Sequence, residues 1–208
     1  MFKCKDYNLD NLVSVCKYLK CKKSHDFSNE SILHQCLLYK YHSSPSQWSI
    51  KLEKAVKQKF NILKSETNTS GDGIINNKKI EIKVSLGDMK GQLNFVQIRP
   101  GHDIDFYLFL GFNLFEYTNN LEIGKIYWFL IPSKQLYNLL PEYGGYAHGT
   151  LIKNGKITLE NISKHKSLEY CLRPNPTKLK SKCRTLWDKL MAYNRSENEI
   201  MDFLNDKN

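Results

Sequence analysis

Two apolar-alternating runs joined by a pair of asparagines constrain this chain more than any other feature. Residues 70–84 read SGDGIINNKKIEIKV, and the two runs meet at Asn76-Asn77. Asparagine tolerates the positive φ angle that a two-residue hairpin turn requires, so we expect two antiparallel strands joined at this point. Counting outward from the turn, this register predicts that Asp72 lies directly opposite Glu81.

Strand alternation determines which side chains of the expected hairpin share a face. Glu81 and Lys83 should lie on one face beside Asp72, whereas Ile80 and Ile82 should point into a core. Two adjacent carboxylates repel each other unless a positive charge lies between them. Mg²⁺ suits that place because it takes one or two carboxylates together with water and phosphate oxygens. The hairpin therefore predicts a magnesium site with a lysine beside it.

The same residues resemble a known enzyme signature. Asp72, followed on the next strand by Glu81-Ile82-Lys83, resembles the D…(D/E)-x-K signature of the PD-(D/E)xK nuclease superfamily. That superfamily includes type II restriction endonucleases and archaeal-type Holliday junction resolvases. The resemblance covers roughly residues 44–132. It implies a restriction-endonuclease-like core of the α/β (α+β) class, in which a central mixed sheet is flanked by helices.

The resemblance also implies a role for each residue of the signature. Asp72, Glu81 and the Ile82 carbonyl are expected to hold Mg²⁺, with Mn²⁺ as a substitute. Lys83 is then placed to orient or deprotonate an attacking water. One position departs from the family pattern, because Gly71 stands where many members have a proline.

A further acidic residue precedes the hairpin on an expected helix. Glu53 lies at the flank of an apolar stripe, in a helix that should begin at the Ser44-Pro45 cap. A glutamate at this place is similar to the one that joins the metal site in resolvases and several restriction enzymes. The alternative is a surface ion pair with Lys57 at the i+4 position.

The length of 208 residues suits a single domain, 1–208. We expect a helical N-terminal portion at 1–42, a catalytic core at 44–140, and DNA-recognition elements with C-terminal helices at 141–208. Two nearly continuous apolar runs are typical of buried central strands. They cover residues 104–112 and 124–131. Ser133 is expected to cap a following helix.

Two groups of side chains are candidates for DNA contacts. Polar residues after the hairpin are suited to hydrogen-bond base edges or phosphates, and a glutamine shortly after E-x-K is similar to a recurrent feature of the superfamily. A glycine-rich loop and a basic tract in the last third could clamp phosphates. The alternative for both groups is an exposed loop and a solvated basic surface. The candidates are Gln92, Asn94, Gln97, Arg99, His148, Lys180 and Lys182.

The charge balance favours a polyanionic partner. The chain has 31 Lys and Arg against 21 Asp and Glu, a net charge of +10. No apolar run approaches the ~18–20 residues that span a bilayer. The first residues lack the apolar stretch of a secretory signal. We therefore expect a cytoplasmic protein that binds double-stranded DNA and no membrane.

The six cysteines lack C-x-x-C spacing, so ordinary reduced thiols are expected. A zinc site is the alternative, although the spacings fit no common zinc finger. Its ligands would come from Cys16, Cys21, His25, His34 and Cys36.

Taken together, these observations predict a Mg²⁺-dependent DNA endonuclease most like a type II restriction enzyme. Such enzymes are commonly homodimers, because cutting both strands of a palindrome needs two sites related by a twofold axis. A structure-selective repair or recombination nuclease would share every catalytic residue named above. A non-enzymatic DNA-binding protein, with Asp72 and Glu81 as surface residues, is the third possibility.

Overall fold

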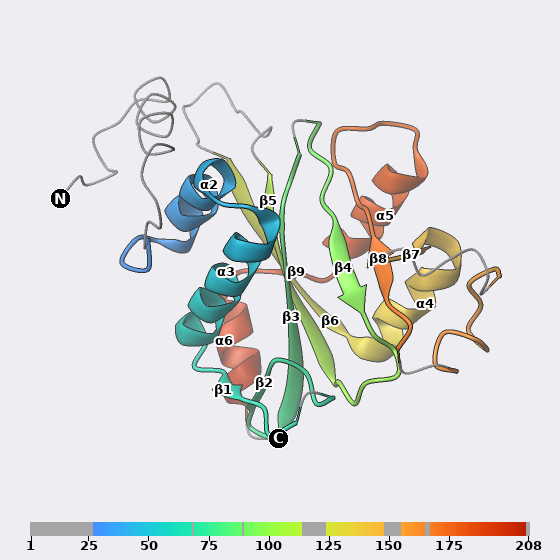
Figure 1. Cartoon of the computed structure of the whole chain (residues 1–208), viewed down its shortest axis with the longest axis horizontal. Coiled ribbons are helices and arrows are strands. Elements are labelled where there is room, and N and C mark those ends of the chain that lie inside the picture. Colours follow the sequence, from blue (N-terminus) through green and yellow to red (C-terminus); the bar gives the residue numbers. More distant parts are fainter. Residues whose placement is uncertain are drawn as a thin grey trace.

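The computed structural model describes residues 27–67, 69–88, 90–113, 124–147, 155–164 and 167–206. Its centre is a six-stranded sheet in the order β1-β2-β3-β5-β6-β9, and a smaller sheet has the order β4-β8-β7. Figure 1 shows α2, α3 and α6 on one side of the large sheet, with α4, α5 and the small sheet on the other. The elements are α2 (Ile32–His42), α3 (Pro45–Lys59), β1 (Leu63–Lys64), β2 (Gly73–Ile75), β3 (Lys78–Leu86), β4 (Phe95–Ile98), β5 (Phe106–Asn113), β6 (Lys125–Pro132), α4 (Ser133–Tyr143), β7 (Gly145–Tyr146), β8 (Tyr170–Leu172), α5 (Lys182–Met191), β9 (Asn194–Arg195) and α6 (Glu197–Asn205).

The predicted hairpin is present, and its turn has the predicted position. β2 pairs antiparallel with β3, and Ile75 lies opposite Lys78. Asn76 and Asn77 have φ angles of 46° and 62°, as a turn with two left-handed residues requires. The asparagines therefore define this hairpin because they adopt its backbone conformation without the cost that other side chains incur.

The large sheet is mixed, as predicted. β3 pairs parallel with β5, and β5 pairs antiparallel with β6. The two apolar runs at 104–112 and 124–131 form β5 and β6, shifted by one or two residues. Because both faces of β5 are covered, Tyr107 through Asn113 are all buried. The chain is thus an α/β protein in which a mixed sheet is flanked by helices.

The large sheet separates two hydrophobic cores. On one face, Ile80 and Ile82 of β3 belong to a core completed by α3 and α6. On the other face, Tyr107 and Phe109 of β5 belong to a core completed by α4, α5 and the small sheet. Glu81 and Lys83 pair in register with Tyr107 and Phe109, so they lie on this second face. β3 thus presents apolar side chains to one core and charged side chains to the edge of the other.

Local signals locate the start of α3 correctly and the cap of α4 incorrectly. Gln47 Oε1 accepts from the Ser44 N–H (3.3 Å) at the start of α3, which completes a capping box. Ser196 and Glu199 form a second capping box at α6. Ser133 is not the predicted cap of α4. It is the first residue of that helix, and its buried hydroxyl donates to the Ile104 carbonyl oxygen (2.6 Å).

The described part of the predicted N-terminal portion contains α2, which begins after the Ser31 cap. Residues 1–26 of that portion lie outside the described residues. Among the helices that are described, none has the length and apolar character needed to cross a bilayer.

Candidate active site

The site forms where β2 ends and β3 continues. The Asp72 N–H donates to the Ile80 carbonyl oxygen (2.8 Å), although Gly73 is the register partner of Ile80. Asp72 and Gly73 therefore both oppose one residue of β3, which is the two-against-one arrangement of a β-bulge. The predicted register is confirmed for Ile75–Lys78, Ile74–Lys79 and Gly73–Ile80, and the bulge ends it before the predicted pair of Asp72 with Glu81. The bulge instead directs the Asp72 carboxylate along β3, where Oδ2 accepts from the Ile82 N–H (2.7 Å).

The bulge explains why a glycine precedes Asp72. Gly71 has φ +77°, a conformation that L side chains rarely adopt and that proline cannot reach. A Cβ at this position would lie 2.6 Å from the Ile80 carbonyl oxygen. The departure from the family pattern at this position is therefore a requirement of the local backbone.

Glu81 is buried and ion-paired. Only 4% of the residue is exposed, and its Oε1 lies 2.5 Å from the Lys83 Nζ. Burial raises the pKa of the Glu81 carboxyl, whereas the Lys83 charge lowers it, the Asp72 charge raises it, and Arg99 lowers it. The charges of Asp72, Lys83 and Arg99 thus all act on this one carboxylate, and Lys83 contacts it directly.

The Ile82 main chain completes the group of oxygen atoms. The N–H and C=O of one strand residue point to the same neighbouring strand. Because the Ile82 N–H points toward Asp72, the Ile82 carbonyl points to that same edge of β3. β2 pairs with β3 only as far as Ile80, and no described strand pairs with this edge beyond it. The Ile82 carbonyl therefore lies on an open sheet edge beside a carboxylate.

An outer group of side chains surrounds Glu81. Arg99 follows β4, and its Nε and Nη2 both donate to Glu169 Oε1 (2.9 and 2.5 Å). The hydroxyls of Tyr107 and Tyr137 lie 3.4 Å apart. Burial raises the pKa of both phenols, and the Glu81 charge adds to this, so both stay neutral.

Sequence reasoning missed Tyr107, Tyr137 and Glu169. Tyr107 lies in an apolar run, where the one available signal is that a buried tyrosine hydroxyl needs a polar partner. Tyr137 and Glu169 come from separate segments, and only the folded chain brings them here.

Glu53 forms the ion pair with Lys57 that was the alternative interpretation, at 2.7 Å. It lies on α3, whose buried residues pack on the Ile80 and Ile82 face of β3. Within the described residues, no hydrogen bond or ion pair joins Glu53 to Asp72 or Glu81, so its role in a metal site stays a prediction.

The polar residues after β3 lie along one strip beside the site. The Asn94 N–H donates to the Ser85 hydroxyl (2.7 Å), and Asn94 Oδ1 accepts from Arg173 Nε (3.3 Å). Gln92 Nε2 donates to the Arg173 carbonyl oxygen (3.3 Å). Gln97 has φ +58°, at a register shift between β4 and β8. A side chain held by such a backbone is re-aimed out of the regular pleat.

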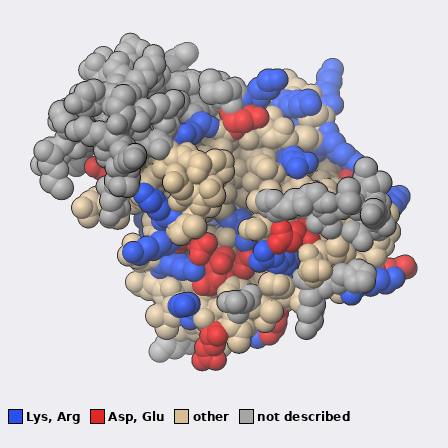
Figure 2. Space-filling view, viewed as in Figure 1, with Lys and Arg blue, Asp and Glu red and all other residues tan. Residues whose placement is uncertain are grey.

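Of the three remaining predicted DNA contacts, two are exposed and one lies outside the described residues. Lys180 and Lys182 are exposed at the start of α5. His148 lies outside the described residues. Figure 2 shows acidic and basic side chains intermixed near the centre of this face of the molecule, with blue surfaces around them. On the face that Figure 2 shows, the described residues thus form no single band of positive charge that would by itself identify a DNA track.

The described residues contain no group of three His, Cys, Asp or Glu side chains that would form a ready-made metal cage. The proposed donor set differs from such a cage, because it has two carboxylates and a main-chain carbonyl, and Mg²⁺ usually keeps water in its remaining positions. Cys36, Cys171 and Cys183 are free thiols. Of the five candidate zinc ligands, His34 and Cys36 are described, whereas Cys16, Cys21 and His25 lie outside the described residues.

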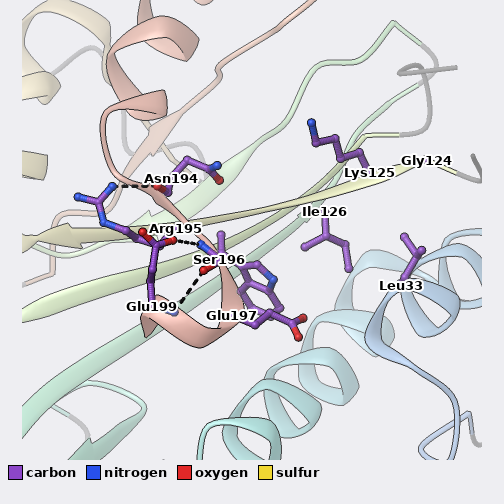
Figure 3. A pocket seen from close by; sticks show the side chains of 10 residues that line it. Leu33, Gly124, Lys125, Ile126, Asn194, Arg195, Ser196, Glu197 and Glu199 are labelled. Carbon is purple, nitrogen blue, oxygen red and sulfur yellow. Dashed lines mark hydrogen bonds between the residues drawn. The ribbon is translucent and has the colours of Figure 1, made fainter. Parts of the chain in front are cut away.

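A larger cavity, of about 960 Å³, lies elsewhere (Figure 3). Ile126 and Trp128 line it, and both belong to the core on the opposite face of the sheet from Glu81. Its carboxylates already serve local structure: Glu197 pairs with Lys59 (2.6 Å), and Glu199 accepts from the Ser196 N–H (2.6 Å). This cavity brings together no reactive group of side chains.

No protein-family model, curated protein or solved structure matches the chain. The resemblance to the PD-(D/E)xK superfamily therefore stays a prediction from the sequence.

Proposed function

We propose that this protein is a Mg²⁺-dependent endonuclease of the PD-(D/E)xK superfamily that hydrolyses phosphodiester bonds in double-stranded DNA. The observation that carries the proposal is the grouping of Asp72, buried Glu81 and Lys83 at an open edge of β3. A buried carboxylate with a second carboxylate beside it is costly for the fold, so a functional explanation is favoured.

The residues fit a hard divalent cation. Asp72, Glu81 and the Ile82 carbonyl would hold it, with Mn²⁺ able to replace Mg²⁺. When bound, the cation would polarise a phosphate oxygen and offset charge on the leaving oxygen. Its positive charge also relieves the repulsion between Asp72 and Glu81, so binding would lower the pKa of the Glu81 carboxyl.

The role that we propose for Lys83 depends on its contact with Glu81. Its ammonium donates to Glu81 Oε1 in the described structure. An ammonium has three donors, so Lys83 would keep a donor for a phosphate oxygen beside a cation held by Glu81. From there Lys83 would orient the attacking water for in-line displacement.

Arg99 acts on this site from outside the hairpin, because its charge lowers the pKa of the Glu81 carboxyl. Both of its hydrogen bonds go to Glu169, which holds the guanidinium in one orientation. It would contact a DNA phosphate on one side while keeping Glu169 on the other.

Two competing functions are separated by simple digests. A type II restriction enzyme would cut plasmid DNA into discrete bands, whereas a structure-selective nuclease would cut only four-way junctions or related structures. A non-enzymatic DNA-binding protein would cut neither. This last possibility is favoured by one observation, since Asp72 and Lys83 already have partners in the described structure. A homodimer and a cytoplasmic location remain predictions, and sedimentation analysis tests the first.

The decisive experiment is a digest of unmodified phage DNA by the purified protein with Mg²⁺, with EDTA, and with Glu81→Ala in place of the natural chain. We expect cleavage only with Mg²⁺ and Glu81. Cleavage that survives in Glu81→Ala would point to a contaminating nuclease or another site. The absence of any Mg²⁺-dependent hydrolysis of duplex or junction DNA would overturn the proposal.

A further inference from the structure

A second cavity, of about 190 Å³, lies on the same side of the sheet as Glu81. Four separate segments contribute to it: the residues before β4, the α4–β7 connection, β8 and the start of α5. This volume exceeds the ~10–15 Å³ that a single water needs. It is well below the ~300–1,000 Å³ of pockets for drug-sized ligands. It therefore suits one small group.

The charge of this cavity is positive. Arg173 and Lys182 line it, and none of the described lining residues is acidic. Arg173 Nε donates to the neutral Asn94 Oδ1, and neither cation has a carboxylate partner among the described residues. Arg99 and Arg184, in contrast, each pair with a carboxylate. Two unpaired cations on one concave surface indicate an anionic ligand.

The neutral residues of the lining add a hydrogen-bond acceptor and an aromatic ring. Gln92 Nε2 already donates to the Arg173 main-chain carbonyl oxygen, so Gln92 Oε1 is the side-chain atom left to accept a hydrogen bond. Tyr143 supplies an aromatic wall. A phosphate beside a planar group with N–H donors matches these features, and a nucleotide has both.

β3 and the residues after it link this cavity to the candidate active site. Ser85 lies on the same face of β3 as Glu81, four residues further on, which is ~13 Å at the usual rise of a strand. The Ser85 hydroxyl accepts from the Asn94 N–H, and Asn94 in turn accepts from Arg173. A nucleotide bound in the cavity would thus lie further along the strand than the phosphate at Glu81.

We infer that this cavity binds the phosphate-bearing part of a single nucleotide, through Arg173 and Lys182. The nucleotide is either one unit of a DNA strand, in which case the inference rests on the proposed function, or a free mononucleotide. Both sources offer the same phosphate chemistry, and the experiment below distinguishes them.

The test is calorimetric titration of the whole protein with deoxyadenosine 5′-monophosphate, inorganic phosphate and deoxyadenosine, in EDTA so that the metal site is not engaged. We expect the nucleotide to bind more tightly than phosphate, and deoxyadenosine to bind at least tenfold more weakly than the nucleotide. Arg173→Gln with Lys182→Gln should weaken the nucleotide at least tenfold. The matched control is Lys54→Gln with Lys64→Gln, which removes the same charge from exposed residues of α3 and β1 and should change nothing.

A cavity-filling variant keeps both cations. A Cβ at Gly145 would meet only the Cys171 sulfur at 3.4 Å and an Arg173 nitrogen at 3.8 Å, which are ordinary contacts. Gly145→Val should therefore fold and should weaken the nucleotide at least tenfold. Nucleotide binding that is unchanged in Gly145→Val and in the double variant, or absent from the natural chain at millimolar concentration, overturns the inference.

DNA binding in EDTA identifies the source. If a DNA strand occupies the cavity, the double variant should flatten the slope of log K against log salt by about 1–2 units beyond the control. An unchanged slope with lost mononucleotide binding assigns the cavity to a free nucleotide. Nucleotide binding that persists in a protein that never cuts DNA would refute the proposed nuclease and leave this site standing.

Discussion

The carboxylate of Asp72 accepts a hydrogen bond from the main-chain N–H of Ile82 at 2.7 Å. A side chain thus takes the place along β3 that the next residue of β2 would occupy in a regular hairpin. The edge of β3 therefore has no paired strand beyond Ile80 within the described residues, and a carboxylate takes the main-chain donor there.

Gly71 should tolerate no side chain, because both its φ of +77° and the 2.6 Å approach of the Ile80 oxygen oppose a Cβ. The left-handed conformation alone costs roughly 1–2 kcal/mol in a non-glycine residue. Gly155 is a matched control, since it has φ +71° and no atom within 4 Å of an added Cβ. In urea denaturation, Gly71→Ala should lose clearly more stability than Gly155→Ala. Gly71→Pro should be worse still, and a fully stable Gly71→Pro protein would show that the bulge is absent.

Three alanine variants test the chemistry. Glu81→Ala and Lys83→Ala should each lower the rate of DNA cleavage by at least about 100-fold, the usual range for a group that takes part in proton transfer or its positioning. Lys83→Ala should still bind DNA more tightly when Mg²⁺ is added, because both carboxylates remain. Lys79 pairs with the exposed Asp103 away from this edge, so Lys79→Ala should change the rate only a few-fold. Equal damage from Lys79→Ala would mean that the active site lies elsewhere.

Substitutions of Glu81 and Lys83 should be strongly non-additive in their effect on the free energy of unfolding. Their side chains are 5% and 13% exposed, so removing one partner leaves the other charge with little water. Glu81→Leu or Lys83→Met alone should each cost about 3–5 kcal/mol of unfolding free energy. The double variant should recover most of that loss, since an apolar pair can replace a buried ion pair at little cost. Additive losses in the double-mutant cycle would contradict this.

The Glu81 carboxyl should titrate above its ordinary value, because burial raises its pKa and Asp72 adds to the effect. A raised pKa in the folded state means a contribution to stability that is present at low pH and lost as pH rises through that pKa. Mg²⁺ requires the ionised carboxylate, so metal affinity should fall as pH drops through the same value. NMR titration of the side-chain carboxyl carbon, without metal, should show a lower pKa in Asp72→Asn and a higher one in Lys83→Met. The opposite order would overturn the assignment of these charges.

Arg99 should contribute to DNA binding to a degree set by Glu169. Glu169→Gln keeps a hydrogen-bond acceptor but removes the negative charge beside Arg99, so DNA should bind severalfold more tightly at low salt. Arg99→Ala should weaken binding and also raise the Glu81 pKa, because Arg99 lowers it. Fluorescence anisotropy at fixed salt measures the first effect. Tighter binding in Arg99→Ala would remove it from the DNA interface.

Local sequence signals predicted the parts of this molecule that short-range chemistry decides. Asn76 and Asn77 set the turn, and alternation assigned Ile80, Ile82 and Glu81 to their faces. The bulge at Asp72 could not be predicted, because it depends on how closely Gly71 packs against the Ile80 carbonyl. Ser133 was misassigned as a cap for a related reason, since a buried carbonyl of a distant loop takes its hydroxyl. Long-range packing decides both.

The site predicted from the sequence also lacked several residues that only the tertiary structure brings together. Glu169 reaches Arg99 from a segment late in the chain, and Tyr137 reaches Tyr107 from α4. None of these has a local pattern that sets it apart from a surface or core residue. The signature residues of the hairpin could be found because they are close in sequence, and their surroundings could not.

The two asparagines of the turn govern more than the hairpin. Side chains of β3 alternate between two environments, so a slip of a single residue in the pairing would exchange them. Ile80 and Ile82 would then lie on the face of the candidate active site, and Glu81 and Lys83 would point into the hydrophobic core formed with α3 and α6. The position of this turn therefore keeps the ion pair on the one face of the sheet where it has partners of opposite charge.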